Sequence, residues 1–289
     1  MKPPPFEYHA PRSLPEAAKL LAELPDAKLI AGGQSLMPML NFRFIAPSHL
    51  IDLNGIGELS YIRKSTDTVA IGAMTRQRDL ELSSIVAAQL PVMREAVGYI
   101  GHVQTRNRGT IGGSLCHLDP AAELPAIAMA YDAEVDTVSI RGVRTMTMAD
   151  FPAGYMTPRI TADEIVKEVR LTAWHGRHSC AFEEFARRRG DFAIVSVVVL
   201  LSAGPDNRIT RVALTLAGIG VAPMRISNAE RLLLGKLPTT AAFEEAAAVC
   251  STAEASEDPY ASAAYRKYLI RTLTLRALNR AAQRLTAAR

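Results

Sequence analysis

Hydrophobic and polar positions change their pattern near residue 173 of the chain. Before it, short apolar runs alternate with segments of helical periodicity, which is typical of mixed helix and strand structure. After it come three longer β-rich runs separated by turns, and then helices. The pattern predicts an α+β protein with two domains, about 1–173 and about 174–289.

The first domain is predicted to interleave helices with short strands. Ser13 and Glu16 are predicted to form a capping box at the start of the first helix. A β-hairpin near the end of the domain is expected to turn at Arg141 and Gly142. The segment "GHVQTRNRGTIGGSLCHLDP" is predicted to be a loop. Helices are expected at 14–24, 36–44, 75–82, 91–100 and 121–130; strands at 28–31, 49–53, 68–73 and 164–171; the hairpin at 133–148.

The second domain is predicted to place helices after an antiparallel sheet. The turn "GPDN" separates its second and third strands, and Ser262 is expected to cap the last helix. Strands are expected at 179–188, 192–203 and 208–219, and helices at 226–234, 240–253 and 262–288.

Composition excludes several classes of protein. Of 289 residues, 48% are hydrophobic and 21% charged, and the net charge is +4, which is ordinary for a soluble globular protein. No basic stripe is interleaved with aromatics, so no nucleic-acid partner is expected. No signal peptide is apparent, and no run reaches the roughly 18 apolar residues of a membrane span. Three dispersed cysteines fit a reducing compartment, so a cytoplasmic protein is expected.

Two glycine motifs could carry chemistry: "AGGQS" at 31–35 and "TIGGS" at 110–114. Glycine has no Cβ, so its amide can approach a phosphate oxygen closely, and a following helix adds unpaired N–H groups. The alternative is that both glycine pairs mark turns or close packing. Neither motif matches the phosphate loop GxxxxGK[ST] or the dinucleotide fingerprint GxGxxG. The residues alone therefore indicate a possible dinucleotide or phosphate ligand on a fold that is not Rossmann.

Other polar groups give weaker indications of a functional site. Cys116, His117 and Asp119 lie close in sequence, but their spacing fits no zinc pattern. No G-x-S-x-G elbow surrounds either serine of the glycine motifs. The run "FARRRGDFA" reads as a β-turn with a salt bridge or as a ligand-facing edge. No catalytic residue and no metal ligand is predicted.

At these motifs the sequence resembles a known family, the FAD-binding medium subunit of molybdenum hydroxylases, which includes carbon monoxide dehydrogenase and xanthine dehydrogenase flavoproteins. The resemblance covers nearly the whole chain, with "KLIAGGQSLMPMLNFR", "TRNRGTIGGSLCHLDPAAELPA" and "FARRRGDFAIV" as its most specific segments. It implies a two-subdomain, PCMH-type (vanillyl-alcohol-oxidase-like) FAD-binding domain at 1–173. A smaller CO dehydrogenase flavoprotein-like C-terminal domain, with an antiparallel sheet and helices, would follow at 174–289.

The resemblance also implies the residues of the cofactor site. The two glycine motifs would wrap the FAD pyrophosphate, an acidic side chain would contact the polyol chain, and two apolar residues would line the cofactor. Glu183 matches a position that carries Lys near the flavin in some relatives, which leaves its role open. The implied set is Ala31, Gly32, Gly33, Gln34, Ser35, Ile100, Thr110, Ile111, Gly112, Gly113, Ser114, Glu123 and Val166.

The implied function is electron transfer through non-covalently bound FAD. In the family, a molybdopterin large subunit hydroxylates the substrate, and a small subunit with two [2Fe-2S] clusters relays electrons to the flavin and on to an external acceptor. Three cysteines are too few for a cluster, so these partners are expected in a heterotrimer or a dimer of heterotrimers. Two alternatives stay open: a stand-alone flavin oxidoreductase of the same fold, and a non-enzymatic binding protein.

Overall fold

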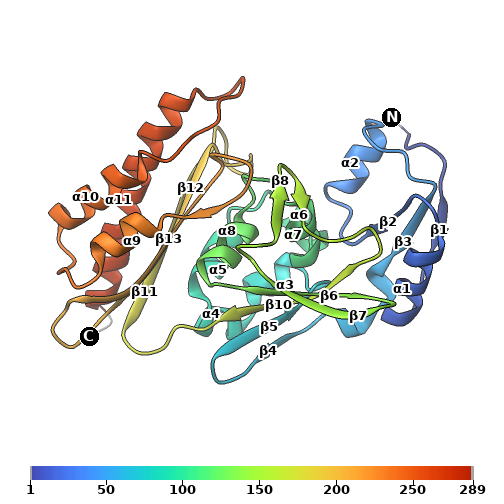
Figure 1. The fold of residues 1–289 in the computed structure, drawn as a ribbon, viewed down its shortest axis with the longest axis horizontal. Helices are drawn as coiled ribbons and strands as arrows, with labels where there is room; N and C mark the ends of the chain where they lie inside the picture. Colours follow the sequence, from blue (N-terminus) through green and yellow to red (C-terminus); the bar gives the residue numbers. More distant parts are fainter. Residues whose placement is uncertain (1, 288–289) are drawn as a thin grey trace.

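The computed structural model describes residues 2–287, and its N-terminal part is a small parallel sheet with two helices (Figure 1). Helix α1 is capped by Ser13, whose Oγ accepts a hydrogen bond from the Glu16 amide at 3.4 Å. The buried face of α1 packs against Ile51 of the central strand, which fixes the sheet against the helix. The elements are β1 (Glu7–His9), α1 (Leu14–Glu23), β2 (Ala27–Ile30), α2 (Leu36–Asn41) and β3 (His49–Asp52), with strand order β1-β3-β2.

The middle part is a five-stranded antiparallel sheet of order β4-β5-β10-β6-β7, packed against helices. The β6–β7 hairpin is confirmed, with Gly142 at a φ of 118° just after the turn. The strands are β4 (Ile62–Lys64), β5 (Thr68–Gly72), β6 (Glu134–Ser139), β7 (Gly142–Thr147) and β10 (Ile165–Thr172), with a separate pair β8 (Pro152–Gly154) and β9 (Thr157–Pro158). The helices are α3 (Gln77–Leu82), α4 (Ser84–Gln89), α5 (Pro91–Val97), α6 (Val103–Arg108), α7 (Ile111–His117) and α8 (Glu123–Ala130), and two 3₁₀ turns cover Leu53–Gly55 and Gly57–Leu59.

The C-terminal part places three helices on a four-stranded antiparallel sheet of order β11-β12-β13-β14. Strand β12 is buried almost throughout, because α11 covers one face of the sheet and α8 lies against the other. The elements are β11 (His178–Phe185), β12 (Val195–Ala203), β13 (Ile209–Ala217), β14 (Met224–Arg225), α9 (Ser227–Leu233), α10 (Thr240–Cys250) and α11 (Ala263–Ala287). Ser262 caps α11 through its Oγ, which accepts from the Tyr265 amide.

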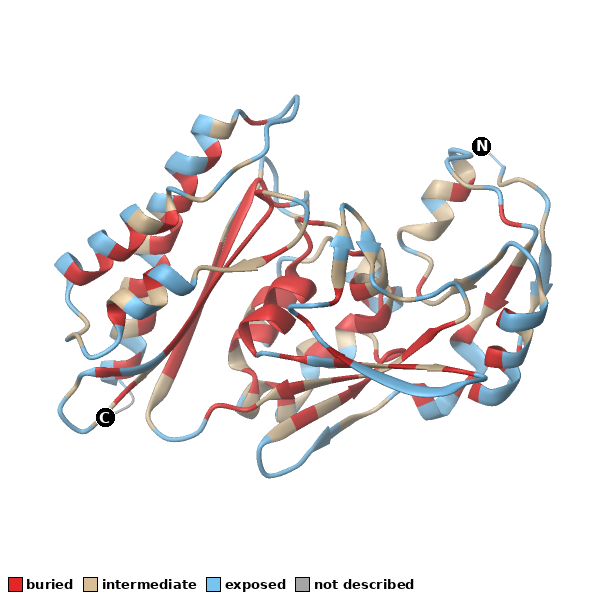
Figure 2. Ribbon diagram, in the orientation of Figure 1, coloured by how far each residue is buried: buried red, intermediate tan, exposed pale blue. Residues whose placement is uncertain are grey.

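Helix α8 lies between the middle and C-terminal parts, and all eight of its residues are buried (Figure 2). Side chains of both parts share one apolar core around it. Ion pairs reinforce this contact: Glu95 of α5 binds Arg280 at 2.5 Å and Arg284 at 2.7 Å, both from α11. The two parts are therefore packed into one body.

The predicted α+β architecture is confirmed, but the predicted loop at 101–120 is wrong. This segment forms α6 and α7, so Gly112 and Gly113 lie inside a helix and not in a loop. The reason is packing: a Cβ built on Gly112 would lie 2.6 Å from the Cβ of Ala73, so the glycine permits α7 to approach β5. Two predicted strands are also too long, since β11 ends at Phe185 and β12 begins at Val195. Position 288 of the predicted last helix lies outside the described residues.

Candidate functional site

The structure brings the two glycine motifs together. A Cβ built on Gly32 would overlap the carbonyl oxygen of Arg108 and lie 2.9 Å from the Cα of Gly109. A Cβ built on Gly113 would lie 3.6 Å from the Cβ of Ala31. Backbone therefore meets backbone at this point, and only the absence of a side chain on Gly32 permits the approach.

The first motif offers free backbone donors. Gly33, with a φ of 72°, turns the chain between β2 and α2. In the described residues 2–287, the amides of Gly33, Gln34 and Ser35 donate to no protein acceptor. Successive free amides on a glycine turn form a concave site for an anion.

The second motif uses its amides within the protein. The amides of Ile111 and Gly112 donate to the carbonyls of Thr75 and Ala73 at 3.2 and 2.9 Å. The Gly113 amide donates to Oγ1 of Thr110 at 3.0 Å, which caps α7. The second motif therefore has few free amides for a ligand. Its role is to pack against the first motif and hold it in position.

Asn54 and Arg76 join the two motifs, and neither was singled out by the sequence. Asn54 donates from Nδ2 to the Ala31 carbonyl at 2.9 Å and accepts from Arg76 at 2.5 Å. Arg76 also donates to the carbonyl of Arg108. Burial, and then the nearby charge of Arg108, lowers the pKa of Arg76. Two cationic side chains thus lie beside the glycine motifs, although the motifs contain none.

Glu123, the expected polyol contact, is the first residue of α8 and is buried. Burial raises its pKa to about 7. Its charge acts on Glu184 of β11, whose pKa is raised to about 8, chiefly by burial. The Oε2 atom of Glu184 is buried and has no hydrogen-bond partner in the described part of the chain. Two carboxyl groups therefore share a poorly solvated region between the middle and C-terminal parts.

Glu183 points away from this region. Residues alternate sides along a strand, and Glu183 pairs with Arg280 at 3.3 Å and Arg276 at 3.7 Å on α11. It is therefore Glu184, and not the Glu183 noted in the sequence, that lies near Glu123.

The remaining expected residues belong to the apolar core or its edge. Val166 of β10 is buried in the core that contains Ile111, and Ile100 packs against the same core after α5. The carbonyl of Ile100 accepts from Arg106 at 3.0 Å, and Arg106 pairs with Glu81 at 3.0 Å. Cys116 and its neighbours form no group with metal-ligand geometry among residues 2–287.

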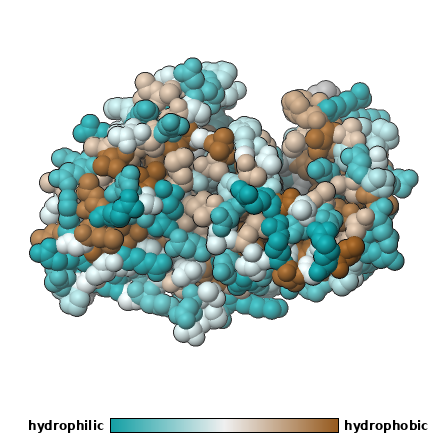
Figure 3. Space-filling model, viewed as in Figure 1, coloured by the Kyte–Doolittle hydropathy of each residue, from teal (hydrophilic) through white to brown (hydrophobic). Residues whose placement is uncertain are grey.

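The surface is notched between the lobe that carries α2 and the middle part (Figure 3). Helix α2, into which the first glycine motif leads, forms one side of this notch. The free amides of the first motif and the two neighbouring arginines can together hold an anionic ligand.

Comparisons with known protein families, sequences and structures match nearly the whole chain. Residues 4–174 match the model of the FAD binding domain in molybdopterin dehydrogenase, and residues 180–281 match that of the CO dehydrogenase flavoprotein C-terminal domain. The chain is 40% identical to the 6-hydroxypseudooxynicotine dehydrogenase complex subunit alpha of Paenarthrobacter nicotinovorans, with 98% of this chain and 97% of the relative covered. It is 39% identical to the carbon monoxide dehydrogenase medium chain of Hydrogenophaga pseudoflava, with 97% and 98% covered. A solved structure of carbon monoxide dehydrogenase from that organism superposes with a TM-score of 0.95, covering 98% of this chain and 99% of the other.

Fold and sequence thus define an FAD-binding domain with a CO dehydrogenase flavoprotein C-terminal domain. The chain belongs to the family of FAD-binding subunits of molybdopterin-dependent dehydrogenases, and it is an oxidoreductase subunit of that family. No helix in the described residues is both long and apolar enough to cross a membrane.

Proposed function

We propose that this chain is the electron-transfer subunit of a molybdenum-containing hydroxylase. It would receive electrons from the [2Fe-2S] clusters of a small subunit and pass them through FAD to an external acceptor. The observation that carries the proposal is the meeting of two glycine motifs around free amides, in a chain that matches its family from end to end. Bound FAD supplies redox chemistry that accepts electrons singly and delivers them singly or in pairs.

The proposed role of the first glycine motif is to hold the pyrophosphate. The amides of Gly33, Gln34 and Ser35 would donate to phosphate oxygens, and Arg76 would offset part of the negative charge. Gly109, just before the second motif, and Gly113 within it would fix the position of the first motif through their close approach to Gly32 and Ala31. Thr110, which caps α7, and Gly112, which packs against Ala73, would hold the second motif in place. The buried, unsatisfied Glu184 and its neighbour Glu123 fit a ligand that brings hydroxyl groups, as the polyol chain of FAD does.

Two partners complete the proposed complex: a molybdopterin subunit and an iron–sulfur subunit. Their contact would need exposed apolar surface, since the centres of stable interfaces are more apolar than ordinary surface. Phe42 and Phe44, just after α2, are 62% and 77% exposed, with ring centroids 6.1 Å apart. This pair supports a partner interface on the N-terminal part.

The test is reconstitution. The purified chain should bind FAD and accept electrons from an artificial reductant, yet hydroxylate no heteroaromatic or aldehyde substrate. Mixed with the molybdopterin and iron–sulfur subunits it should turn over with an external acceptor, and the native complex should contain both Mo and Fe. A single chain that oxidises an organic substrate without Mo or Fe would instead establish the stand-alone flavin oxidoreductase.

A further inference from the structure

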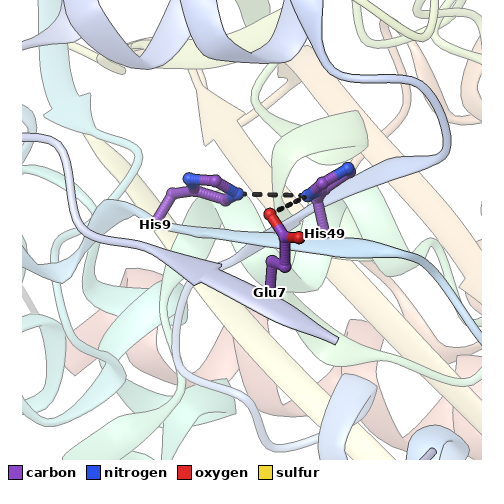
Figure 4. A group of neighbouring side chains, drawn as sticks. All are labelled: Glu7, His9 and His49. Carbon is purple, nitrogen blue, oxygen red and sulfur yellow. Dashed lines mark hydrogen bonds and ion pairs between the residues drawn. The ribbon is translucent and has the colours of Figure 1, made fainter. Parts of the chain in front are cut away.

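Three possible metal ligands lie together on the N-terminal sheet: Glu7 and His9 of β1 and His49 of β3 (Figure 4). Strands β1 and β3 run parallel, and Glu7 is paired with His49 in the register. Residues two apart on a strand project from the same face, so all three side chains share one side of the sheet. In Figure 4 the two imidazole rings and the carboxylate point toward one another.

The distances between the donor atoms suit a small cation. Nε2 of His9 lies 3.1 Å from Nδ1 of His49, and Nδ1 of His49 lies 3.5 Å from Oε2 of Glu7. In a tetrahedral zinc site, bonds of 2.0–2.1 Å separate neighbouring ligand atoms by about 3.3 Å. Two of the three separations are therefore close to those of ligands around one ion, and all three donor atoms lie within 4.8 Å of one another.

The donor set disfavours the hard cations and suits a transition metal. Two imidazole nitrogens and one carboxylate oxygen suit Zn²⁺, whereas Mg²⁺ and Ca²⁺ prefer oxygen ligands alone. Glu7 is 75% exposed and His49 only 14%, so an ion would enter from solvent at the Glu7 side. Three protein ligands leave a fourth position for water.

We propose that Glu7, His9 and His49 bind Zn²⁺ and thereby fasten the N-terminal strand to the sheet. Strand β1 contains three residues and, within the described part of the chain, pairs with β3 alone, so few hydrogen bonds hold this edge. A bound ion adds a link between β1 and β3, and any ligand that binds only the folded chain stabilises it. None of the three residues belongs to the proposed cofactor site, so this inference does not depend on the proposed function.

The test uses the full chain with its cofactor, freed of metal by EDTA and desalting. Titration calorimetry with Zn²⁺ should show one ion bound per chain, and zinc should raise the melting temperature. His9→Gln and His49→Gln should each weaken binding by more than the roughly 10- to 100-fold that loss of an outer-shell partner costs. His175→Gln is the matched control, because His175 also lies beside a carboxylate, that of Asp67 at 3.3 Å, but has no second histidine.

Two further measurements keep the test decisive if a histidine variant misfolds. Glu7→Gln changes an exposed side chain and should fold normally, yet bind zinc more weakly. X-ray absorption of the zinc-loaded chain should show scattering from two imidazole rings. The proposal is overturned if calorimetry shows no zinc binding to the native chain, if His175→Gln lowers affinity as much as His49→Gln does, or if the absorption spectrum shows no imidazole. In that case the 3.1 Å contact is a hydrogen bond between two imidazoles.

Discussion

Gly32 and Arg108 touch backbone to backbone, since a Cβ built on Gly32 would lie 2.8 Å from the carbonyl carbon of Arg108. The two residues are far apart in sequence: Gly32 belongs to the first glycine motif, and Arg108 lies just before the second. Their contact positions the free amides of the first motif against α7. The spacing between the two motifs therefore depends on the absence of a Cβ atom at Gly32.

We expect Gly32→Ala to separate the motifs. Overpacking of this kind costs about 1–3 kcal/mol of stability, and the displaced amides should lower FAD retention. The checks are the ratio of flavin to protein after purification and the melting temperature. Gly57→Ala is the control, because a Cβ there meets nothing within 4 Å. Full flavin content with an unchanged melting temperature in Gly32→Ala would contradict the contact.

Gly33→Asp and Gly112→Asp should behave differently. At Gly33 the new Cβ would lie 3.2 Å from the flexible Met37 side chain, and aspartate can adopt the φ of 72° at a cost of about 1–2 kcal/mol. The variant should therefore fold with slightly lower stability and lose FAD through repulsion between the carboxylate and the pyrophosphate. At Gly112 the Cβ would meet Ala73 inside the core, so this variant should lose stability as well as flavin. Circular dichroism and flavin content separate the two outcomes. A folded Gly33→Asp protein with full flavin would show that the pyrophosphate lies elsewhere.

This contrast shows what the sequence could not supply. The motif "TIGGS" was expected to be a loop because glycine disfavours helices, yet Gly112 lies in α7, where contact with Ala73 decides the structure. The sequence pattern predicts strand β11, but the alternation of side chains does not show that Glu184 faces α8 while Glu183 faces α11. Arg76 belongs to no recognisable sequence motif, and its hydrogen bond to Asn54 is visible only in the folded structure. Long apolar strands and capped helices were predictable because their signals are local.

Arg76→Gln should weaken FAD binding. The change removes a cation beside the first motif and its hydrogen bond to the Arg108 carbonyl. We expect the Kd to rise on the order of tenfold, which corresponds to about 1.4 kcal/mol. The salt dependence of binding should fall as well, because salt screens charge interactions. Fluorescence titration of the flavin-free chain measures both, with Arg63→Gln as the control, since Arg63 stacks on Tyr61. Equal affinities for Arg76→Gln and the native chain would remove Arg76 from the site.

The flavin should be released by acid precipitation. A covalent link would need a reactive histidine or cysteine beside the ring. Burial raises the pKa of the Cys116 thiol to about 12, which leaves almost no thiolate at neutral pH. We therefore expect the yellow colour in the supernatant, measured by its absorbance. Colour that remains with the precipitated protein would show a covalent bond.

Glu184→Gln should change how stability depends on pH. Burial raises the pKa of Glu184 from 4.5 to about 8 and that of Glu123 from 4.5 to about 7. Between pH 4.5 and 8 the folded chain therefore holds protons that the unfolded chain has released. Stability is full below pH 4.5 and falls as pH rises through this window, by at most about 1.4 kcal/mol per pH unit for each carboxyl. Because the two carboxyls interact, their effects are not additive.

Glutamine keeps the neutral shape of Glu184 without the titrating proton. We expect the native chain and Glu184→Gln to be similarly stable at pH 5, and the variant to be the more stable of the two at pH 8. Denaturant unfolding of the flavin-free chain at pH 5, 6.5 and 8 measures the difference. Glu244→Gln, at an exposed position of α10, is the control and should follow the native curve. If the curves of Glu184→Gln and the native chain stay parallel across this range, Glu184 is ionised in the folded chain and does not share a buried region with Glu123.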